Sequence, residues 1–233
     1  MNFQEGEILI FDKPLGWTSF DVVNKIRAFI KYNAHIPKLK VGHAGTLDPL
    51  ATGVLIVCTG KFTKRIEEFQ VFEKEYTGTF TFGATTPSYD LEKEIDQHYD
   101  ISHITPSLIH EAVKKFIGNI SQIPPVFSAV KIDGKRAYKY ARNDEEVIIQ
   151  PKQINIKEFE ITGISFPEVH FRIVCSKGTY IRAIARDLGK EVNSGAYLSK
   201  LCRTRIGEFT IENAISIDSF KEAVLLEFSS IIL

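Results

Sequence analysis

One loop of this chain, KVGHAGTLDPLATGVLIV at residues 40–57, contains the residue best suited to chemistry. Asp48 precedes Pro49, and a proline disfavours the α conformation for the residue before it, so we expect Asp48 to be extended. Asp48 also lies between Leu47 and Leu50, just before an apolar run, which predicts a rigid and partly desolvated carboxylate. Such a group is a candidate for catalysis. The alternative is an aspartate that caps or turns a loop.

A desolvated carboxylate takes up a proton unless a cation lies nearby. The best candidate for that cation is Arg182 in KGTYIRAIARDLG, near the start of a predicted helix and directly after a glycine turn. Arg186 follows one turn later on the same helix face. The alternative interpretation places both arginines on the surface.

Other known catalytic motifs are missing from the sequence. It contains no GxSxG motif. The segment TGKFT at residues 59–63 lacks the glycine that a phosphate loop needs five residues before Gly60, and Phe62 displaces the required hydroxyl residue. The histidines show neither HExxH nor paired Cys/His spacing, so we expect no metal site and no cofactor; they are His35, His43, His98, His103, His110 and His170.

The elements that must position these residues follow from hydrophobic periodicity and turn signals. We expect helices at residues 19–31 with Ser19 as N-cap and Phe20, Val23, Ile26 and Ile30 on the apolar face, at 63–69, at 105–117 with Thr105 as N-cap and Pro106 at the first position, at 179–192 and at 217–228. We expect extended segments at 8–11, 53–59, 76–83, 126–132, 147–164 and 169–174, a tight turn at Asp133-Gly134, and a last strand pair around 201–211.

Strands and helices interleave without a steady βαβ repeat, which predicts an α+β fold with a mixed, largely antiparallel central sheet flanked by helices. Residues 32–53 contain Gly42, Gly45, Pro49 and Gly53 and show no helical period, so we expect a long loop there. Long loops inside compact domains tend to be functional.

Composition limits the class of protein. The 233 residues carry 29 basic and 29 acidic side chains, 44% are hydrophobic and 25% are charged, which excludes disordered and fibrous classes. We expect a single catalytic domain over residues 1–233, or two packed lobes. The longest apolar stretch, at 51–58, is far shorter than the roughly 20 residues of a membrane span, and the N-terminus lacks the basic region of a signal peptide. Cys58, Cys175 and Cys202 fit buried free thiols in the cytoplasm.

The neutral net charge hides local segregation. Residues 131–142 hold five bases with Tyr138 and Tyr140 between them, whereas residues 90–100 hold five acids. A polyanion would be attracted to the first segment and repelled by the second. The alternative is that both are solvated faces. Further bases occur at Lys38, Lys40, Lys61, Lys64, Arg65, Lys200, Arg203 and Arg205.

The segment GHAGTLDPLATGVLIVCTG at residues 42–60 resembles the catalytic-loop motif of the TruB family of tRNA pseudouridine synthases. Four other segments fall in the order of that family, so the resemblance spans nearly the whole chain: KPLGWTS at 13–19, KEYTGTFTFG at 74–83, IPPVFSAVKIDGKRAYKYAR at 123–142 and CSKGTYIRAIARDLG at 175–189. The resemblance implies the pseudouridine synthase fold.

The resemblance also implies catalytic roles. Asp48 matches the aspartate that drives cleavage of the glycosidic bond of the uridine, and Arg182 matches the arginine that pairs with it. Tyr76 matches the tyrosine that stacks on the flipped base and can act as base for the closing proton removal. Detaching, turning and rejoining a base through C5 involves no net redox change, so no cofactor is needed.

The implied substrate is uridine 55 in the T-stem-loop of tRNA. Tyr180 and Leu201 match residues that line the uridine pocket, and His43 matches a histidine that packs into the T-loop as the base swings out. Extracting a nucleotide from its stack costs a few kcal/mol, which aromatic stacking and backbone contacts offset.

Many family members continue into a C-terminal RNA-binding domain, and this chain resembles the short form without it. Nothing in the sequence is patterned as a dimerisation helix, so we expect a monomer, and no segment is long enough to span a membrane, so we expect no membrane association. Archaeal and eukaryotic relatives that work with guide RNAs and protein partners share the TLDP loop, but the short chain argues against that role, so we expect no obligatory protein partner. Two other functions stay open at this point: a tRNA-binding factor without enzymatic activity, and an N-glycosidic hydrolase that releases free base. A product assay on an unmodified T-stem-loop separates all three.

Overall fold

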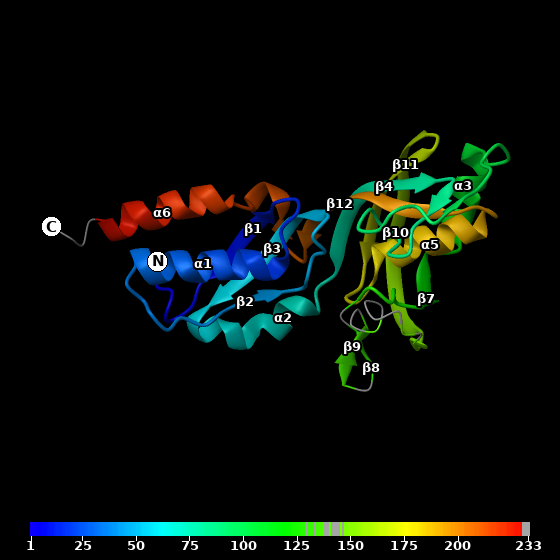
Figure 1. Ribbon diagram of the computed structural model, residues 1–233. Coiled ribbons are helices and arrows are strands. Elements are labelled where there is room, and N and C mark those ends of the chain that lie inside the picture. The colour runs from blue at the N-terminus through cyan, green and yellow to red at the C-terminus, as the bar shows by residue number, and fades with distance from the viewer. Residues whose placement is uncertain (129, 133, 138–139, 141–144, 146, 230–233) are drawn as a thin grey trace. The chain divides into compact units, whose positions relative to one another are not determined.

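The computed structural model divides the chain into two compact units (Figure 1). It describes residues 1–128, 130–132, 134–137, 140, 145 and 147–229. Unit 1 comprises Met1–Tyr76 and Cys202–Leu233, and unit 2 comprises Thr77–Leu201. The chain passes from one unit to the other within strands β4 (Lys74–Phe82) and β12 (Ala196–Ile206). That both units act as one catalytic domain stays a prediction.

A sheet with helices on both faces forms the core of unit 1. Strands β1 (Ile8–Lys13), β3 (Ala51–Thr59) and β12 are neighbours in this order, β2 (Val41–Ala44) pairs with β3, and β13 (Phe209–Thr210) pairs with β12. The helical segments are α1 (Ser19–Asn33), η1 (Gly60–Arg65), α2 (Ile66–Gln70), η2 (Ile211–Asn213) and α6 (Ile217–Ser229).

Strand β3 is apolar on both faces because each face is covered. Leu55 and Val57 lie in one buried cluster with residues of α1 and α6, whereas Ile56 and Cys58 lie in a second cluster with Phe69 of α2. Because successive residues of β3 enter the two clusters in turn, both faces of the strand must be apolar, which explains the continuous apolar run in the sequence.

The N-cap of helix α1 lies one residue earlier than we expected. Thr18, not Ser19, is the N-cap, and it forms a capping box with Asp21. Ser19 is 2% exposed, and its hydroxyl group donates to Leu47 O instead of capping the helix. Phe20 is 59% exposed, so its predicted place on the apolar face is wrong; it lies about 120° around the helix from Ile26.

The predicted loop at residues 32–53 contains a strand. Strand β2 pairs antiparallel with β3, with His43 opposite Val57 and Ala44 opposite Ile56. Four residues that include a glycine carry no local strand signal, and the pairing with β3 decides their conformation. A β-carbon on Gly42 would lie 2.7 Å from the Ile66 side chain, so α2 approaches this strand closely.

Unit 2 contains a second part of the sheet, with neighbours in the order β12, β4, β11, β10 and β7. The remaining elements are β5 (Ala84–Thr85), β6 (Gln97–His98), α3 (Pro106–Lys114), β7 (Gly118–Gln122), β8 (Lys131–Ile132), β9 (Lys135–Arg136), β10 (Lys152–Ser165), β11 (Glu168–Cys175) and α5 (Ile181–Glu191). Strand β10 pairs antiparallel with both neighbours. The α+β fold class is confirmed, as is the cap of α3 by Thr105 with Pro106 following it.

Several local expectations are met only in part. Of the described residues in the segment expected to be extended at 126–132, only Lys131–Ile132 form a strand. The expected tight turn agrees with the left-handed Gly134, whereas Asp133 lies outside the described residues. Tyr138, Lys139 and Arg142 of the basic segment also lie outside them. Cys58 and Cys175 are buried, but Cys202 is only partly so. Among the described residues, no helix is long and apolar enough to cross a membrane.

Candidate active site

In unit 1, Asp48 lies in a loop whose main chain is hydrogen-bonded to neighbouring segments at several positions. The side chain of Ser19 donates to Leu47 O at 3.1 Å and accepts from Leu47 N at 2.8 Å. The amide of Gly16 donates to Pro49 O at 2.9 Å. Asp48 O accepts from Ala51 N at 3.1 Å, so Asp48 opens a tight turn with proline in its second position. These bonds are made by main-chain groups of the loop and do not depend on the Asp48 side chain, which is half-buried.

Lys13 is a buried cation beside this loop. Its side chain is 0% exposed, and its ammonium group donates to Trp17 O at 2.6 Å, Pro14 O at 2.9 Å and Pro49 O at 3.4 Å. Burial lowers the pKa of Lys13 to about 8, while the negative charge of Asp48 acts in the opposite direction. The Asp48 loop therefore lies close enough to the ammonium group for the two charges to interact.

The lowered pKa of Lys13 predicts a pH-dependent contribution to stability. Lys13 releases its proton at about pH 8 in the folded chain, against a usual value of 10.5, so between these values the unfolded chain binds more protons and stability rises with pH. We expect the loss of unfolding free energy in Lys13→Met to be larger at pH 9.5 than at pH 7, by about 2 kcal/mol. Urea unfolding at both pH values measures it. A difference that does not change with pH would contradict the lowered pKa, and exposed Lys61→Met is the control.

Arg203 of β12 binds the other end of the loop. Its guanidinium group donates to Val54 O at 2.8 Å, Gly45 O at 2.9 Å and Thr46 O at 3.5 Å, and the side chain is 1% exposed. Arg203 is one of the bases that we expected to attract a polyanion, but its side chain is buried and binds the loop carbonyls instead.

His43 lies on β2, next to the same loop. Burial lowers the pKa of His43, and the nearby charge of Arg203 lowers it further, so the imidazole is neutral at neutral pH. Its Nδ1 atom is buried and has no hydrogen-bond partner among the described residues.

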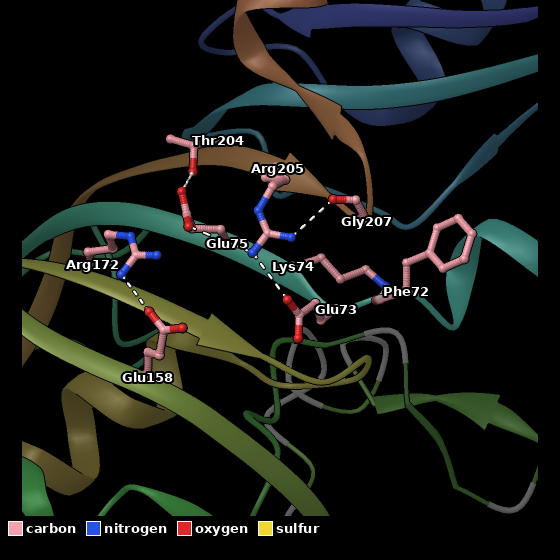
Figure 2. A network of polar contacts seen from close by, with 9 residues as sticks. All are labelled: Phe72, Glu73, Lys74, Glu75, Glu158, Arg172, Thr204, Arg205 and Gly207. Atoms are coloured by element: carbon pink, nitrogen blue, oxygen red, sulfur yellow. Dashed lines mark hydrogen bonds and ion pairs between the residues drawn. The ribbon is translucent and has the colours of Figure 1, made fainter.

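Tyr76 is the last residue of unit 1 before the chain crosses into unit 2, and it is 9% exposed. A polar network fixes the start of its strand (Figure 2). Arg205 donates to Glu73 at 3.2 Å and to Gly207 O at 3.0 Å, and Thr204 donates to Glu75 at 2.8 Å. These bonds fix the residues of the chain directly before Tyr76.

Unit 2 holds Arg182 in the first turn of α5, where it is 4% exposed. Its guanidinium group donates to Ser88 O at 3.1 Å and Phe127 O at 3.0 Å, and its Nε lies 3.5 Å from a carboxylate oxygen of Asp90. Asp90 is itself 4% exposed. Arg182 is thus a buried arginine with a buried carboxylate partner, and the surface alternative is wrong.

The position of Asp90 is fixed by its own loop. The carbonyl of Asp90 accepts from Thr86 Oγ1 at 2.7 Å, and its carboxylate accepts from Glu92 N at 3.0 Å. Tyr89 next to it has a left-handed φ of 62°, and Arg186 packs over the Tyr89 ring at 5.1 Å. Arg186 donates to Asp187 and Ile123 O, so the two arginines of α5 have different partners.

The N-terminus of α5 is tied to β7. Gln122, 2% exposed, accepts from Tyr180 N at 2.9 Å and donates to Tyr180 O at 3.1 Å. Tyr180 and Leu201 are both half-buried. This pair of bonds fixes the backbone that carries Tyr180 and, two residues later, Arg182.

Each unit therefore holds part of the predicted set. His43, Asp48 and Tyr76 belong to unit 1, whereas Tyr180, Arg182 and Leu201 belong to unit 2. The pairing of Asp48 with Arg182 joins the two units and stays a prediction. Among the described residues, no group of three or more His, Cys, Asp or Glu side chains is arranged to hold a metal ion.

Four residues of the site were missed from the sequence: Lys13, Ser19, Asp90 and Arg203. Lys13 and Ser19 are the ends of KPLGWTS, one of the segments that carry the family resemblance, so a signal for them was present. Asp90 was assigned to an acidic stretch that repels polyanions, but it is buried against Arg182. No local pattern distinguishes it from its exposed acidic neighbours.

Comparison with known proteins gives consistent matches. Residues 31–181 match the family model described as TruB family pseudouridylate synthase (N terminal domain). Over 222 residues the chain is 61% identical to the tRNA pseudouridine synthase B of Phocaeicola vulgatus, covering 95% of this chain and 94% of that protein. The tRNA pseudouridine synthase B of Flavobacterium johnsoniae is 56% identical over 223 residues, with 95% and 97% covered.

Solved structures share the fold. A chain in the crystal structure of a Cbf5-Nop10-Gar1 complex superposes with a TM-score of 0.69 and 28% identity over 94% of this chain. A chain in the structure of an H/ACA RNP bound to a substrate RNA containing 2'-deoxyuridine gives 0.70 and 25% over 99%. The chain spans 54% and 57% of the length of these two solved chains.

Proposed function

Because the chain belongs to the TruB family of pseudouridylate synthases, we propose that it acts on uridine 55 in the T-stem-loop of tRNA with Asp48 as its catalytic carboxylate. Its reaction is the isomerisation of uridine to pseudouridine in tRNA. The observation that carries the role of Asp48 is the anchoring of its loop, in which Gly45, Thr46, Leu47 and Pro49 are each bound by groups from other elements.

The reaction sets the tasks of these residues. The flipped uridine must lose its bond between C1′ and N1, turn, and rejoin C1′ through C5, after which the proton on C5 must leave. Asp48 drives the bond cleavage, and a carboxylate held in place by its loop needs little reorganisation to do so. Arg182 is the proposed cationic partner of the Asp48 carboxylate.

The aromatic residues bind the nucleotide. Tyr76 stacks on the flipped base, and stacking of this kind is worth about 1–3 kcal/mol per base, comparable to the cost of unstacking. The Tyr76 phenol is also the proposed base for the final proton removal. Tyr180 and Leu201 line the uridine pocket, and the neutral imidazole of His43 packs into the T-loop.

A product assay tests this function. The purified chain is incubated with an unmodified T-stem-loop RNA, and the nucleosides are separated by chromatography. Pseudouridine at position 55 is the expected product, formed without added protein, metal or cofactor. Saturable binding without pseudouridine would favour a tRNA-binding factor, and release of free uracil would favour an N-glycosidic hydrolase. We further propose that the enzyme is a monomer and works in the cytoplasm; light scattering measures its mass.

Binding of tRNA is expected to weaken steeply with salt. Of the eight bases named above outside residues 131–142, six are exposed, namely Lys38, Lys40, Lys61, Lys64, Arg65 and Lys200. Some of them form ion pairs, such as Lys61 with Glu5. If about four of them contact phosphates, the log of the binding constant falls against log salt with a slope of about −3. Fluorescence titration between 50 and 200 mM KCl measures the slope, and a flat plot would contradict the phosphate contacts.

A further inference from the structure

Arg203 is the largest fully buried side chain in the described part of the chain, at 1% exposure. Arginine is rarely buried to this extent, because removing its charge from water is costly unless hydrogen bonds replace the hydration. The bonds of Arg203 go to the main-chain carbonyls of Gly45, Thr46 and Val54. Two of these three carbonyls lie in the Asp48 loop, so Arg203 connects β12 to that loop.

Lys13 is a second buried cation close to Arg203. The positive charge of Arg203 lowers the pKa of Lys13, which means that the two cations repel each other. The negative charge of Asp48 acts on Lys13 in the opposite direction and more strongly than Arg203 does. The Asp48 loop is therefore what brings the two buried cations close together.

The two cations hold opposite ends of the loop. Arg203 binds Gly45 and Thr46 before Asp48, and Lys13 binds Pro49 after it. Gly45 has a left-handed φ of 91°, and the Nη1 atom of Arg203 lies 3.6 Å from the point that a β-carbon there would occupy. The left-handed turn at Gly45 therefore lies next to the guanidinium group of Arg203.

We propose that Arg203 is a positioning residue that fixes the first half of the loop, so that the Asp48 carboxylate is held in its reactive orientation. This proposal rests on the catalytic role proposed for Asp48. Arg203 does not contact RNA directly, because its guanidinium group is covered by protein. Removing it is therefore expected to slow the chemical step and to leave the affinity for tRNA unchanged.

The test compares Arg203→Gln and Arg203→Lys with Arg172→Gln as the control. Arg172 lies on β11 in unit 2, and its guanidinium group donates to Glu158 at 2.7 Å (Figure 2). Single-turnover rates are measured with enzyme in excess over T-stem-loop RNA, so that the rate does not depend on the amount of active enzyme. Dissociation constants and thermal midpoints are measured alongside.

We expect Arg203→Gln to lower the single-turnover rate about 100-fold, as a misplacement of about 1 Å does. Arg203→Lys keeps the charge and one donor, so the loss is expected to be about tenfold. Both should bind RNA as the wild type does, and Arg172→Gln should keep the wild-type rate.

Equal rates for Arg203→Gln and Arg172→Gln would overturn the proposal, and so would a loss of RNA affinity that accounts for the whole defect. If Arg203→Gln does not fold, Arg203→Lys decides, and a rate equal to that of the wild type overturns the proposal. Asp48→Asn is measured in parallel. Full activity of that variant would refute the role of Asp48, whereas its inactivity together with active Arg203 variants refutes only the positioning role.

Discussion

Asp48→Asn is expected to lower pseudouridine formation by at least about 10⁴-fold, because an uncharged amide can neither attack nor accept a proton at the glycosidic bond. The substitution conserves the shape of the side chain. The bonds that hold the loop are made by Ser19, Gly16 and the main chain of Asp48 itself, and none of them needs the carboxylate. The fold and the affinity for tRNA should therefore be retained.

Nucleoside analysis after single-turnover reaction measures this loss, with a binding titration on the same preparation. Asp12→Asn is a matched control, because Asp12 also acts electrostatically on Lys13 and its Oδ1 accepts from Gly53 N at 3.1 Å, which an asparagine oxygen can do as well. This control should keep a rate close to that of the wild type. Near-normal turnover of Asp48→Asn would remove Asp48 from the reaction.

Local signals predicted the elements of the fold whose conformation is decided locally. Thr105 and Pro106 were identified as cap and first residue of α3 because both roles depend on a few neighbouring residues. The same kind of signal existed for α1, where Thr18 and Asp21 are three residues apart as in a capping box, but Ser19 competed for the assignment. Its hydroxyl instead binds Leu47, and this contact with residue 47 is invisible in the local sequence.

Contacts between distant segments were the part that could not be predicted. Strand β2 exists because residues 41–44 pair with β3, and no feature of VGHA indicates a strand by itself. The buried ion pair of Arg182 and Asp90 joins residues 92 positions apart. Periodicity showed that Arg182 lies on an apolar helix face, but not which carboxylate it meets.

The candidate site shows the same division. Asp48 and Arg182 were identified as candidates from local features: Asp48 is a carboxylate directly before a proline, and Arg182 is a cation shortly after a glycine turn. Lys13 and Arg203 were not, since a lysine or arginine at a buried strand position looks in sequence like one at an exposed position. The main-chain carbonyl groups that accept hydrogen bonds from Lys13 and Arg203 come together only in the folded chain, so the sequence does not show that these side chains are buried.

Arg182→Lys is expected to lower pseudouridine formation about 10³-fold. The guanidinium group reaches Ser88 O, Phe127 O and the Asp90 carboxylate through three different nitrogens, and a single ammonium group cannot occupy three such directions at once. The substitution therefore leaves buried acceptors without partners, and each lost bond to a charged group costs about 1.5–3 kcal/mol. The positive charge is retained, so a purely electrostatic role for Arg182 would predict a small effect instead.

Arg186→Lys is the matched control for this prediction, because Arg186 lies one turn later on α5, donates to Asp187 and Ile123 O, and packs on the Tyr89 ring instead of pairing with the Asp90 carboxylate. Its rate should stay within a few-fold of wild type. Asp90→Asn, measured in the same single-turnover assay, tests the partner, since it removes the charge that faces Arg182 and should lower the rate without lowering the affinity for RNA. A rate for Arg182→Lys that equals that of Arg186→Lys would show that the geometry of the guanidinium group is not used, and Arg182 would then be excluded from the site.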